Sequence, residues 1–262
     1  MNRTILTVSA FDSSCATGIG ADLKTLQAFR LYGAAVATCV LAQNTQGIQA
    51  VRPLPMEMVG LQIEAVASDM KISAVKLGVM GSSENLQIVA SMVGALGLTG
   101  LVVVDPGLKG PCGETLMEET DLARYRSSII PLATVLVVNR PEAEALTGMA
   151  LSDMIAAKEA AKALVDLGAK NVILAGGRFE GTRSLDLLYD GSGYHLFDAP
   201  KSPSSNTLGI GGSFSAALTA LLAKGCLMAE AIDRSKKYIA KAVQHPFQIG
   251  KGRGPLNHNV PI

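Results

Sequence analysis

The feature that most constrains the fold of this chain is the alternation of short apolar runs with longer stretches of helical spacing. The runs at residues 101–104 and 134–138 are apolar without alternation, which is typical of strands covered on both faces. Stretches with apolar positions three or four residues apart separate such runs. Strands that alternate with helices along the chain predict an α/β fold with a mostly parallel central sheet and helices on both faces.

The same pattern gives approximate element positions. It predicts strands at residues 5–8, 35–41, 74–77, 101–104, 134–138, 171–174 and 184–189. It predicts helices at residues 21–30, 55–68, 85–96, 152–167, 212–224 and 228–244, and one that starts near Pro141 with Asn139 as its cap. With 262 residues, of which 48% are hydrophobic, we expect a single domain over residues 1–262.

Composition argues against several kinds of partner. The net charge is +1 and Lys and Arg form no stripe, so we expect no nucleic acid. No apolar stretch approaches the roughly 20 residues of a membrane span, so we expect no membrane. The cysteines Cys15, Cys39, Cys112 and Cys226 lack the spacing of a metal or redox motif. Free thiols in a reducing cytoplasm are therefore the expectation.

Polar residues and glycines gather where the predicted strands end. These segments are residues 10–12, 43–45, 78–80, 105–107, 139–142 and 175–177. In an open parallel sheet a ligand binds at the carboxyl ends of the strands. We therefore expect these segments to surround one site.

A glycine-rich segment, residues 206–212, opens the helix predicted at residues 212–224. Gly209, Gly211 and Gly212 leave backbone N–H groups bare, and the helix dipole adds partial positive charge there. This predicts a phosphate site that needs no cation. The same glycines also suit a tight turn into a closely packed helix.

Segments spread over nearly the whole chain resemble the hydroxymethylpyrimidine/phosphomethylpyrimidine kinases of the ribokinase-like superfamily. They are residues 17–25, 42–45, 104–106, 139–146, 175–177, 206–207 with Gly209 and Gly211, and the tail 250–258. A single Gly-Gly is weak, but the joint order and spacing are specific. The resemblance implies transfer of the ATP γ-phosphoryl group to an aminopyrimidine hydroxymethyl group and then to its monophosphate, in thiamine biosynthesis. It also implies Mg²⁺ and a homodimer, and it leaves open a monovalent cation beside the anion hole.

The resemblance assigns roles to individual positions. The N–H groups of Gly209, Ile210 and Gly211 are expected to form the anion hole, and Asp105 and Glu142 to lie at Mg²⁺. The ATP-binding positions that it implies are Asn139, Glu142, Gly176, Gly177 and Thr207. The substrate-binding positions that it implies are Asp22, Gln43, Val79 and Gly107.

Ordinary structural roles compete with these assignments. Asp105 suits the cap of an Asp-Pro turn, and Asn139 and Glu142 suit the start of a helix. Gln43 suits the end of a strand and Asp22 the start of a helix. In the tail, Asn257 and His258 are expected only to hold the C-terminal segment in place.

The chain departs from the family at positions that carry chemistry. Gly212 stands where the family has a Cys, or its relatives an Asp, as the base for the attacking hydroxyl, and loss of a general base costs about 10²–10⁴ in rate. Ser213 is adjacent, but a hydroxyl without a partner is a poor base. The other departures are Leu208 for His, Ile210 for Thr, Ala175 for Lys, Val79 for Met, Gly107 for Val, and fewer glycines in the loop 13–18.

Three functions stay open on these residues. The first is a kinase for hydroxymethylpyrimidine and its monophosphate, slowed by the missing base. A monophosphate substrate relies less on that base, because its own phosphate can accept the proton. The second is a ligand-binding homologue without catalysis. The third is a kinase for another hydroxymethyl heterocycle, such as pyridoxal.

Overall fold

The computed structural model describes residues 3–177, 183–200, 204, 206–245 and 247–262. These residues form one nine-stranded sheet in the order β3-β2-β1-β4-β5-β6-β7-β8-β9. The strands are β1 (Thr4–Asp12), β2 (Tyr32–Asn44), β3 (Gly47–Pro53), β4 (Ile72–Leu77), β5 (Val102–Val104), β6 (Val135–Val138), β7 (Val172–Gly177), β8 (Arg183–Tyr189) and β9 (Tyr194–Pro200).

The sheet is mostly parallel, which confirms the expectation from the alternating pattern. Strands β2, β1, β4, β5, β6 and β7 are parallel neighbours. Strand β3 adds to one edge and β8 and β9 add to the other, all antiparallel. Strands β3 and β9 are additions to the predicted set. They are edge strands with several exposed residues, so they lack the continuous apolar run on which strand prediction depends.

Helices connect the strands. They are α1 (Gly18–Ala28), α2 (Met56–Ala67), α3 (Ser83–Ala95), α4 (Leu122–Ser128), α5 (Arg140–Thr147), α6 (Met154–Asp166), α7 (Ile210–Ala223) and α8 (Met228–Gln244), with 3₁₀ turns at Glu119–Asp121 and Ile130–Leu132. The short helix α4 is not among the predicted helices. None of the helices in the described residues has the length and apolar character needed to cross a membrane.

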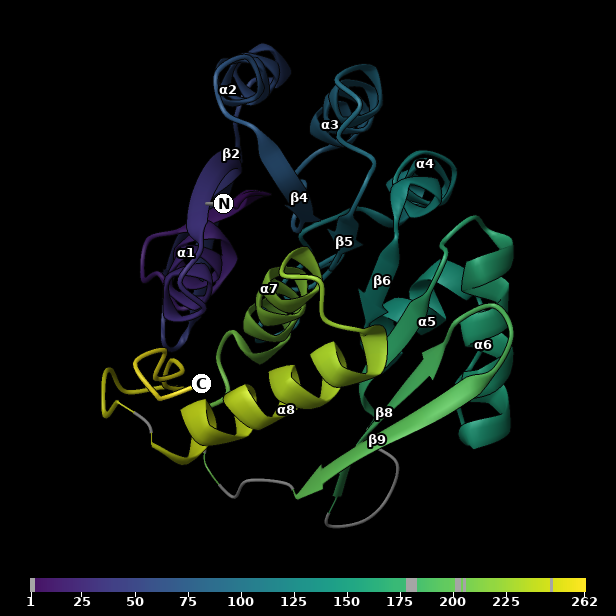
Figure 1. Ribbon diagram of the computed structural model, residues 1–262. Coiled ribbons are helices and arrows are strands. Elements are labelled where there is room, and N and C mark those ends of the chain that lie inside the picture. The colour runs from purple at the N-terminus through teal and green to yellow at the C-terminus, as the bar shows by residue number, and fades with distance from the viewer. Residues whose placement is uncertain (1–2, 178–182, 201–203, 205, 246) are drawn as a thin grey trace.

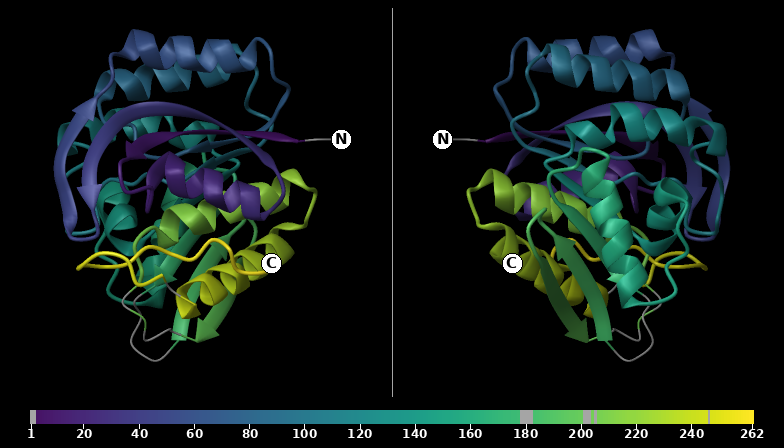
Figure 2. Two further views of the ribbon diagram at one scale, coloured as in Figure 1. Left: turned by 90° about the vertical axis from the view of Figure 1, so that its left-hand side faces the viewer. Right: turned by 90° about the vertical axis from the view of Figure 1, so that its right-hand side faces the viewer.

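The helices form two layers, one on each face of the sheet (Figure 1). Helices α1, α7 and α8 cover one face, where Phe29, Leu218 and Ile232 belong to one buried apolar cluster. Helices α2 to α6 cover the other face, where a second cluster includes Ile63 and Leu164. Figure 2 shows the sheet between these layers. Burial on both faces explains the apolar runs of the central strands.

One helix start and three strand ends that matter for the site differ from the prediction. Helix α7 begins at Ile210 with Gly209 as its N-cap, so Gly211 and Gly212 lie inside its first turn. Asp12, Gln43 and Gly177 lie within the last residues of β1, β2 and β7 rather than beyond them. Glycine has poor helix propensity, so a sequence pattern places the start of α7 too late. All four cysteines are free thiols, as expected.

Candidate active site

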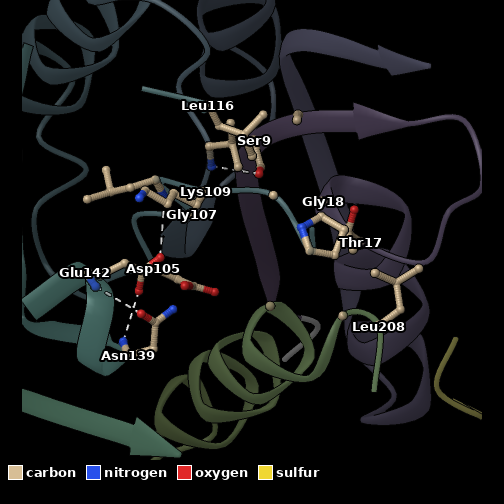
Figure 3. A pocket seen from close by; sticks show the side chains of 18 of the residues that line it. Ser9, Thr17, Gly18, Asp105, Gly107, Lys109, Leu116, Asn139, Glu142 and Leu208 are labelled. Atoms are coloured by element: carbon tan, nitrogen blue, oxygen red, sulfur yellow. Dashed lines mark hydrogen bonds between the residues drawn. The ribbon is translucent and has the colours of Figure 1, made fainter. Parts of the chain in front are cut away.

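A cavity of about 710 Å³ lies at the carboxyl ends of the parallel strands. Its wall includes the ends of β1 and β2, the segments after β4, β5 and β6, the loop at residues 107–113, and the start of α7. Figure 3 shows Asp105, Asn139 and Glu142 together on one side, and Thr17, Gly18 and Leu208 on another. The segments that the sequence analysis expected at one site therefore do meet.

Helix α7 points its N-terminal turn toward this cavity. Gly209 and Gly212 line the cavity, whereas Gly211 is an exposed residue of the same turn that is not part of the lining. Gly209 has φ +87°, and a Cβ there would lie 2.0 Å from the carbonyl oxygen of Ala16. Only glycine satisfies both demands. The tight turn at Gly209 therefore fixes the start of α7 beside the cavity, and the first N–H groups of a helix have no partner within the helix.

Asp105 and Glu142 bring two carboxylates to the same part of the wall. Glu142 is buried, and its Oε1 and Oε2 accept hydrogen bonds from the N–H groups of Leu108 (3.3 Å) and Asn139 (3.0 Å). Burial and then the charge of Asp105 raise the pKa of Glu142 to about 8. A bound cation would relieve both effects, since it supplies the missing opposite charge.

Asn139 and Glu142 also form the helix start that sequence predicted for them. The Asn139 side chain accepts from the N–H of Glu142 at 3.0 Å, which completes a capping box at the start of α5. Both residues line the cavity nonetheless. Structural and ligand-facing roles therefore coexist at these two positions.

These carboxylates fit a magnesium ion. The described residues contain no cluster of three or more His, Cys, Asp or Glu side chains suited to a metal. Mg²⁺ in nucleotide sites usually takes one or two carboxylates and completes its shell with water and phosphate oxygens. Asp105, which accepts from Ser215 Oγ at 2.8 Å, and Glu142 meet that requirement.

Gln43, Val79 and Gly107 line another part of the cavity. Gln43 Nε2 donates to Asp12 Oδ2 at 3.0 Å, while its buried Oε1 has no partner among the described residues. That oxygen has almost no exposed surface, so it can accept a hydrogen bond from a ligand amine only after the side chain turns. Gly107 has φ +57°, and a Cβ there would lie 2.7 Å from Val79 Cγ2. The absent side chain lets the two residues pack as one flat wall.

Asp22 lies behind the cavity wall, and Lys76 lies at its surface. Lys76 Nζ is 2.8 Å from Asp22 Oδ1 in a buried ion pair, and Thr7 Oγ1 donates to Asp22 Oδ2. Lys76 lines the cavity and Asp22 does not. Burial raises the pKa of Asp22 against the opposing effect of Lys76. Between these two residues, the structure therefore places Lys76 at the surface of the cavity.

Gly212 faces this ion pair. A Cβ on Gly212 would lie 3.8 Å from Asp22 Oδ1 and 4.0 Å from Lys76 Nζ, which are ordinary contact distances. The adjacent Ser213 points elsewhere: its Oγ lies 3.0 Å from Nε2 of His258 in a buried contact with the tail. Burial and then Lys24 lower the pKa of His258 to about 4, so its ring is neutral near pH 7. His258 thus holds the tail in place, as expected.

A second cavity of about 290 Å³ adjoins the first. Gly176 and Thr207 line both cavities. Its remaining wall is largely apolar, with Ile210 and Phe214 of α7 among its residues. Gly177 is the last residue of β7 before the undescribed segment 178–182. A ligand with an apolar ring and a polar tail can therefore extend from the second cavity into the first.

Three residues of the site were not singled out from sequence. Asp12 accepts hydrogen bonds from Ser14, Ala16 and Thr17 and so organises the loop that meets Gly209. Lys76 carried a usable signal, because a charged residue inside an apolar strand needs a buried partner. The third residue, Arg253, comes from the tail and lines the first cavity.

Comparisons with known proteins identify the family of this chain. The family described as phosphomethylpyrimidine kinase matches residues 12–257. A hydroxymethylpyrimidine/phosphomethylpyrimidine kinase of Haemophilus influenzae is 39% identical over 98% of this chain and 96% of that protein. A thiamine biosynthesis bifunctional protein of Geobacter sulfurreducens is 38% identical over 97% of this chain, which spans 52% of that protein.

A solved structure with the same fold is the ADP complex of Bacillus subtilis pyridoxal kinase. Its TM-score is 0.88 at 31% identity, with 98% of each chain covered. The family match and the identity to the Haemophilus kinase both extend over nearly the whole chain. The chain belongs to the phosphomethylpyrimidine kinase family.

Proposed function

We propose that this protein transfers the γ-phosphoryl group of ATP to hydroxymethylpyrimidine and to its monophosphate. The observation that carries the proposal is the first cavity. Gly209 at the start of α7 lines it together with the acidic residues Asp105 and Glu142. Bare N–H groups bind phosphate, and paired acids suit the Mg²⁺ that accompanies it. Phosphoryl transfer depends mainly on such positioning and charge stabilisation.

The nucleotide occupies both cavities in this proposal. Its base lies in the second, largely apolar cavity, and its phosphates pass Gly176 and Thr207 into the first. Asn139 and Glu142 lie beside the phosphates, and Gly177 continues the same strand as Gly176. Asp105 and Glu142 hold Mg²⁺, which neutralises phosphate charge when it is bound. The resemblance to the hydroxymethylpyrimidine/phosphomethylpyrimidine kinases also leaves open a monovalent cation beside the anion hole.

The pyrimidine occupies the part of the cavity lined by Gln43, Val79 and Gly107. The unpaired Oε1 of Gln43 accepts a hydrogen bond from the exocyclic amine once the side chain turns toward the cavity, and Val79 and Gly107 pack on the ring. Asp22 acts on the substrate through Lys76. This arrangement selects a flat aromatic amine.

The glycine at position 212 should affect the two phosphorylation reactions differently. It offers no proton acceptor to a free hydroxyl, while the Lys76 ammonium still stabilises charge on the attacking oxygen. A phosphate monoester already carries a nucleophilic oxygen anion near pH 7 and needs no such acceptor. We therefore propose that the monophosphate is the faster substrate.

An ADP-release assay with Mg²⁺-ATP and each pyrimidine tests the proposal. We expect turnover with the monophosphate and slower turnover with the free alcohol. Absence of ADP release above a no-enzyme control with both would reject the kinase. Thermal stabilisation by ligands without turnover would then indicate a binding homologue.

Pyridoxal is the second candidate substrate, because the Bacillus subtilis structure with the same fold is a pyridoxal kinase. Pyridoxal also carries a hydroxymethyl group on a flat ring. Including it in the same assay ranks the candidates by kcat/KM. A higher value for pyridoxal than for both pyrimidines would replace the proposed substrate.

The family resemblance also supports a homodimer in the cytoplasm. Light scattering during size-exclusion chromatography measures the mass directly. A mass of about twice the 27.2 kDa chain is expected for the dimer.

A further inference from the structure

Among the described residues, Arg253 is a cation of the first cavity without a carboxylate partner. In the part of the chain that the structure describes, the basic residues that line that cavity are Lys76, Lys109, Arg140 and Arg253. Lys76 pairs with Asp22 and Arg140 pairs with Glu144. Among the described residues, neither Lys109 nor Arg253 takes part in an ion pair. Arg253 therefore brings uncompensated positive charge to the cavity, as an anionic ligand requires.

The guanidinium of Arg253 lies where the two cavities meet. Its Nε and Nη2 donate to Thr207 Oγ1 at 3.1 and 2.7 Å, and its Nη1 donates to the carbonyl oxygen of Pro111 at 3.1 Å. Thr207 lines both cavities, and Pro111 belongs to the loop that covers the first. An arginine has five N–H donors, so two stay available, one on each terminal nitrogen. Paired donors of this kind suit phosphate oxygens.

Glycines on both sides fix the position of Arg253. A Cβ on Gly252 would lie 2.0 Å from the carbonyl oxygen of Thr45, and one on Gly254 would lie 1.6 Å from Asn206 Oδ1. The N–H of Leu208 also donates to the carbonyl oxygen of Gly254 at 3.2 Å. The tail therefore approaches the start of α7 more closely than other residues allow. The backbone is set in place, which reduces the entropy lost when the side chain binds a ligand.

We propose that Arg253 contacts the polyphosphate of the nucleotide and is a specificity residue for nucleotides with more than one phosphate. The inference rests on the proposed function, because it places the phosphates along Thr207. Arg253 links the loop at residues 107–113 to Thr207, because it donates to the carbonyl oxygen of Pro111 and to Thr207 Oγ1. With ligand, its remaining donors reach the phosphate oxygens. The tail thus supplies a binding residue as well as a structural strap.

Calorimetric titration of adenosine, AMP and ADP tests this contact without turnover. We expect Arg253→Gln to weaken ADP binding about 10- to 100-fold, as for lost charge-assisted hydrogen bonds, and to leave adenosine binding unchanged. Arg253→Lys should be intermediate, since it keeps the charge without the paired donors. Lys251→Gln is the matched control, because Lys251 is exposed in the same tail and does not line the cavity.

The outcomes separate the two proposals. Equal weakening of adenosine and ADP would reduce Arg253 to a structural strap, and unchanged ADP binding would remove the contact. A raised KM for the pyrimidine monophosphate with unchanged ADP binding would show that Arg253 contacts the phosphate of the substrate and not those of the nucleotide. That result would overturn the inference. If the natural protein bound none of the three nucleotides, the proposed function itself would fail. Melting temperatures of the variants confirm that each is folded.

Discussion

Gly212 leaves space beside the buried ion pair of Lys76 and Asp22. A cysteine fits there, because its Cβ would meet only atoms at 3.8 and 4.0 Å. The Lys76 ammonium would favour the thiolate, which is the form that accepts a proton. We predict that Gly212→Cys accelerates phosphorylation of the free alcohol about 10²–10⁴-fold. The gain for the monophosphate should be smaller, because that substrate needs no base.

Gly212→Ala controls for filling the space without adding a base. Both variants are measured in the ADP-release assay with both pyrimidines. Equal rates for the Cys and Ala variants would show that proton transfer does not limit the natural protein.

Glu142 provides a pH-dependent test of the acid pair. Its raised pKa means that the folded protein binds a proton that the unfolded chain releases near the ordinary value of 4.5. The stabilisation is therefore present below pH 4.5 and is lost as pH rises toward about 8. We predict that Glu142→Gln removes this decline, with a relative gain on the order of 1–4 kcal/mol above pH 8. Urea unfolding from pH 5 to 9 measures the free energy of unfolding of both proteins. The same pH dependence in both would contradict the raised pKa of Glu142.

Several site residues could be predicted because strand ends in a parallel sheet converge. Gln43, Asp105 and Asn139 all line the cavity for that reason. Asp22 and Lys76 show what sequence leaves open. Either member of a buried pair can face the ligand, and only packing places Lys76 at the surface of the cavity.

The C-terminal tail contains a buried histidine, His258, that makes its stability depend on pH. His258 is neutral when folded, with a pKa of about 4, because burial and then Lys24 disfavour its charged form. The unfolded chain takes up the proton near pH 6.5, so the stabilisation is present above pH 6.5 and is lost as pH falls toward 4. We predict that His258→Gln reduces this acid loss by on the order of 1–3 kcal/mol.

Urea unfolding at pH 7 and pH 5 measures the acid loss. His245→Gln is the control, because His245 is exposed. The hydrogen-exchange protection factors of residues 250–258, corrected for the intrinsic rate at each pH, should fall first on acidification. Tail protection that stays constant to pH 4 would contradict the prediction.

Most elements could be predicted from sequence, and the exceptions share a cause. Central strands such as β5 and β6 are buried on both faces and read as continuous apolar runs. The edge strands β3 and β9 gain their order from pairing with a neighbour, which local sequence does not record. Helix α7 was placed too late for a similar reason, since packing of Gly209 on Ala16 overrides glycine's poor helix propensity.

At the scale of the whole molecule, α7 joins the site to the core. Ten of its fourteen residues are buried, and Leu218 lies in the cluster between α1, α8 and the sheet. We predict that Leu218→Ala lowers the free energy of unfolding by about 2–5 kcal/mol, because it leaves a cavity in a packed core. Leu227→Ala, at a side chain that is 78% exposed, is the control and should change little. Urea unfolding compares the two, and equal losses would contradict the assignment of α7 to the core.

The α/β class and the mostly parallel sheet could be predicted because the alternating pattern spans the chain. Expectation of a single domain over residues 1–262 stays a prediction. The position of the tail could not be predicted, since residues 250–258 show no periodicity and depend on contacts with Thr45 and Asn206.

The contact between Gly209 and Ala16 joins two residues that are synthesised at different times. The loop organised by Asp12 is made early in synthesis, and the helix start that it meets is made late. A nascent chain can therefore build most of the sheet before it contains the proposed phosphate site. In the proposed function, a chain that stops before Ile210 lacks the start of α7 and therefore cannot bind the nucleotide phosphates there.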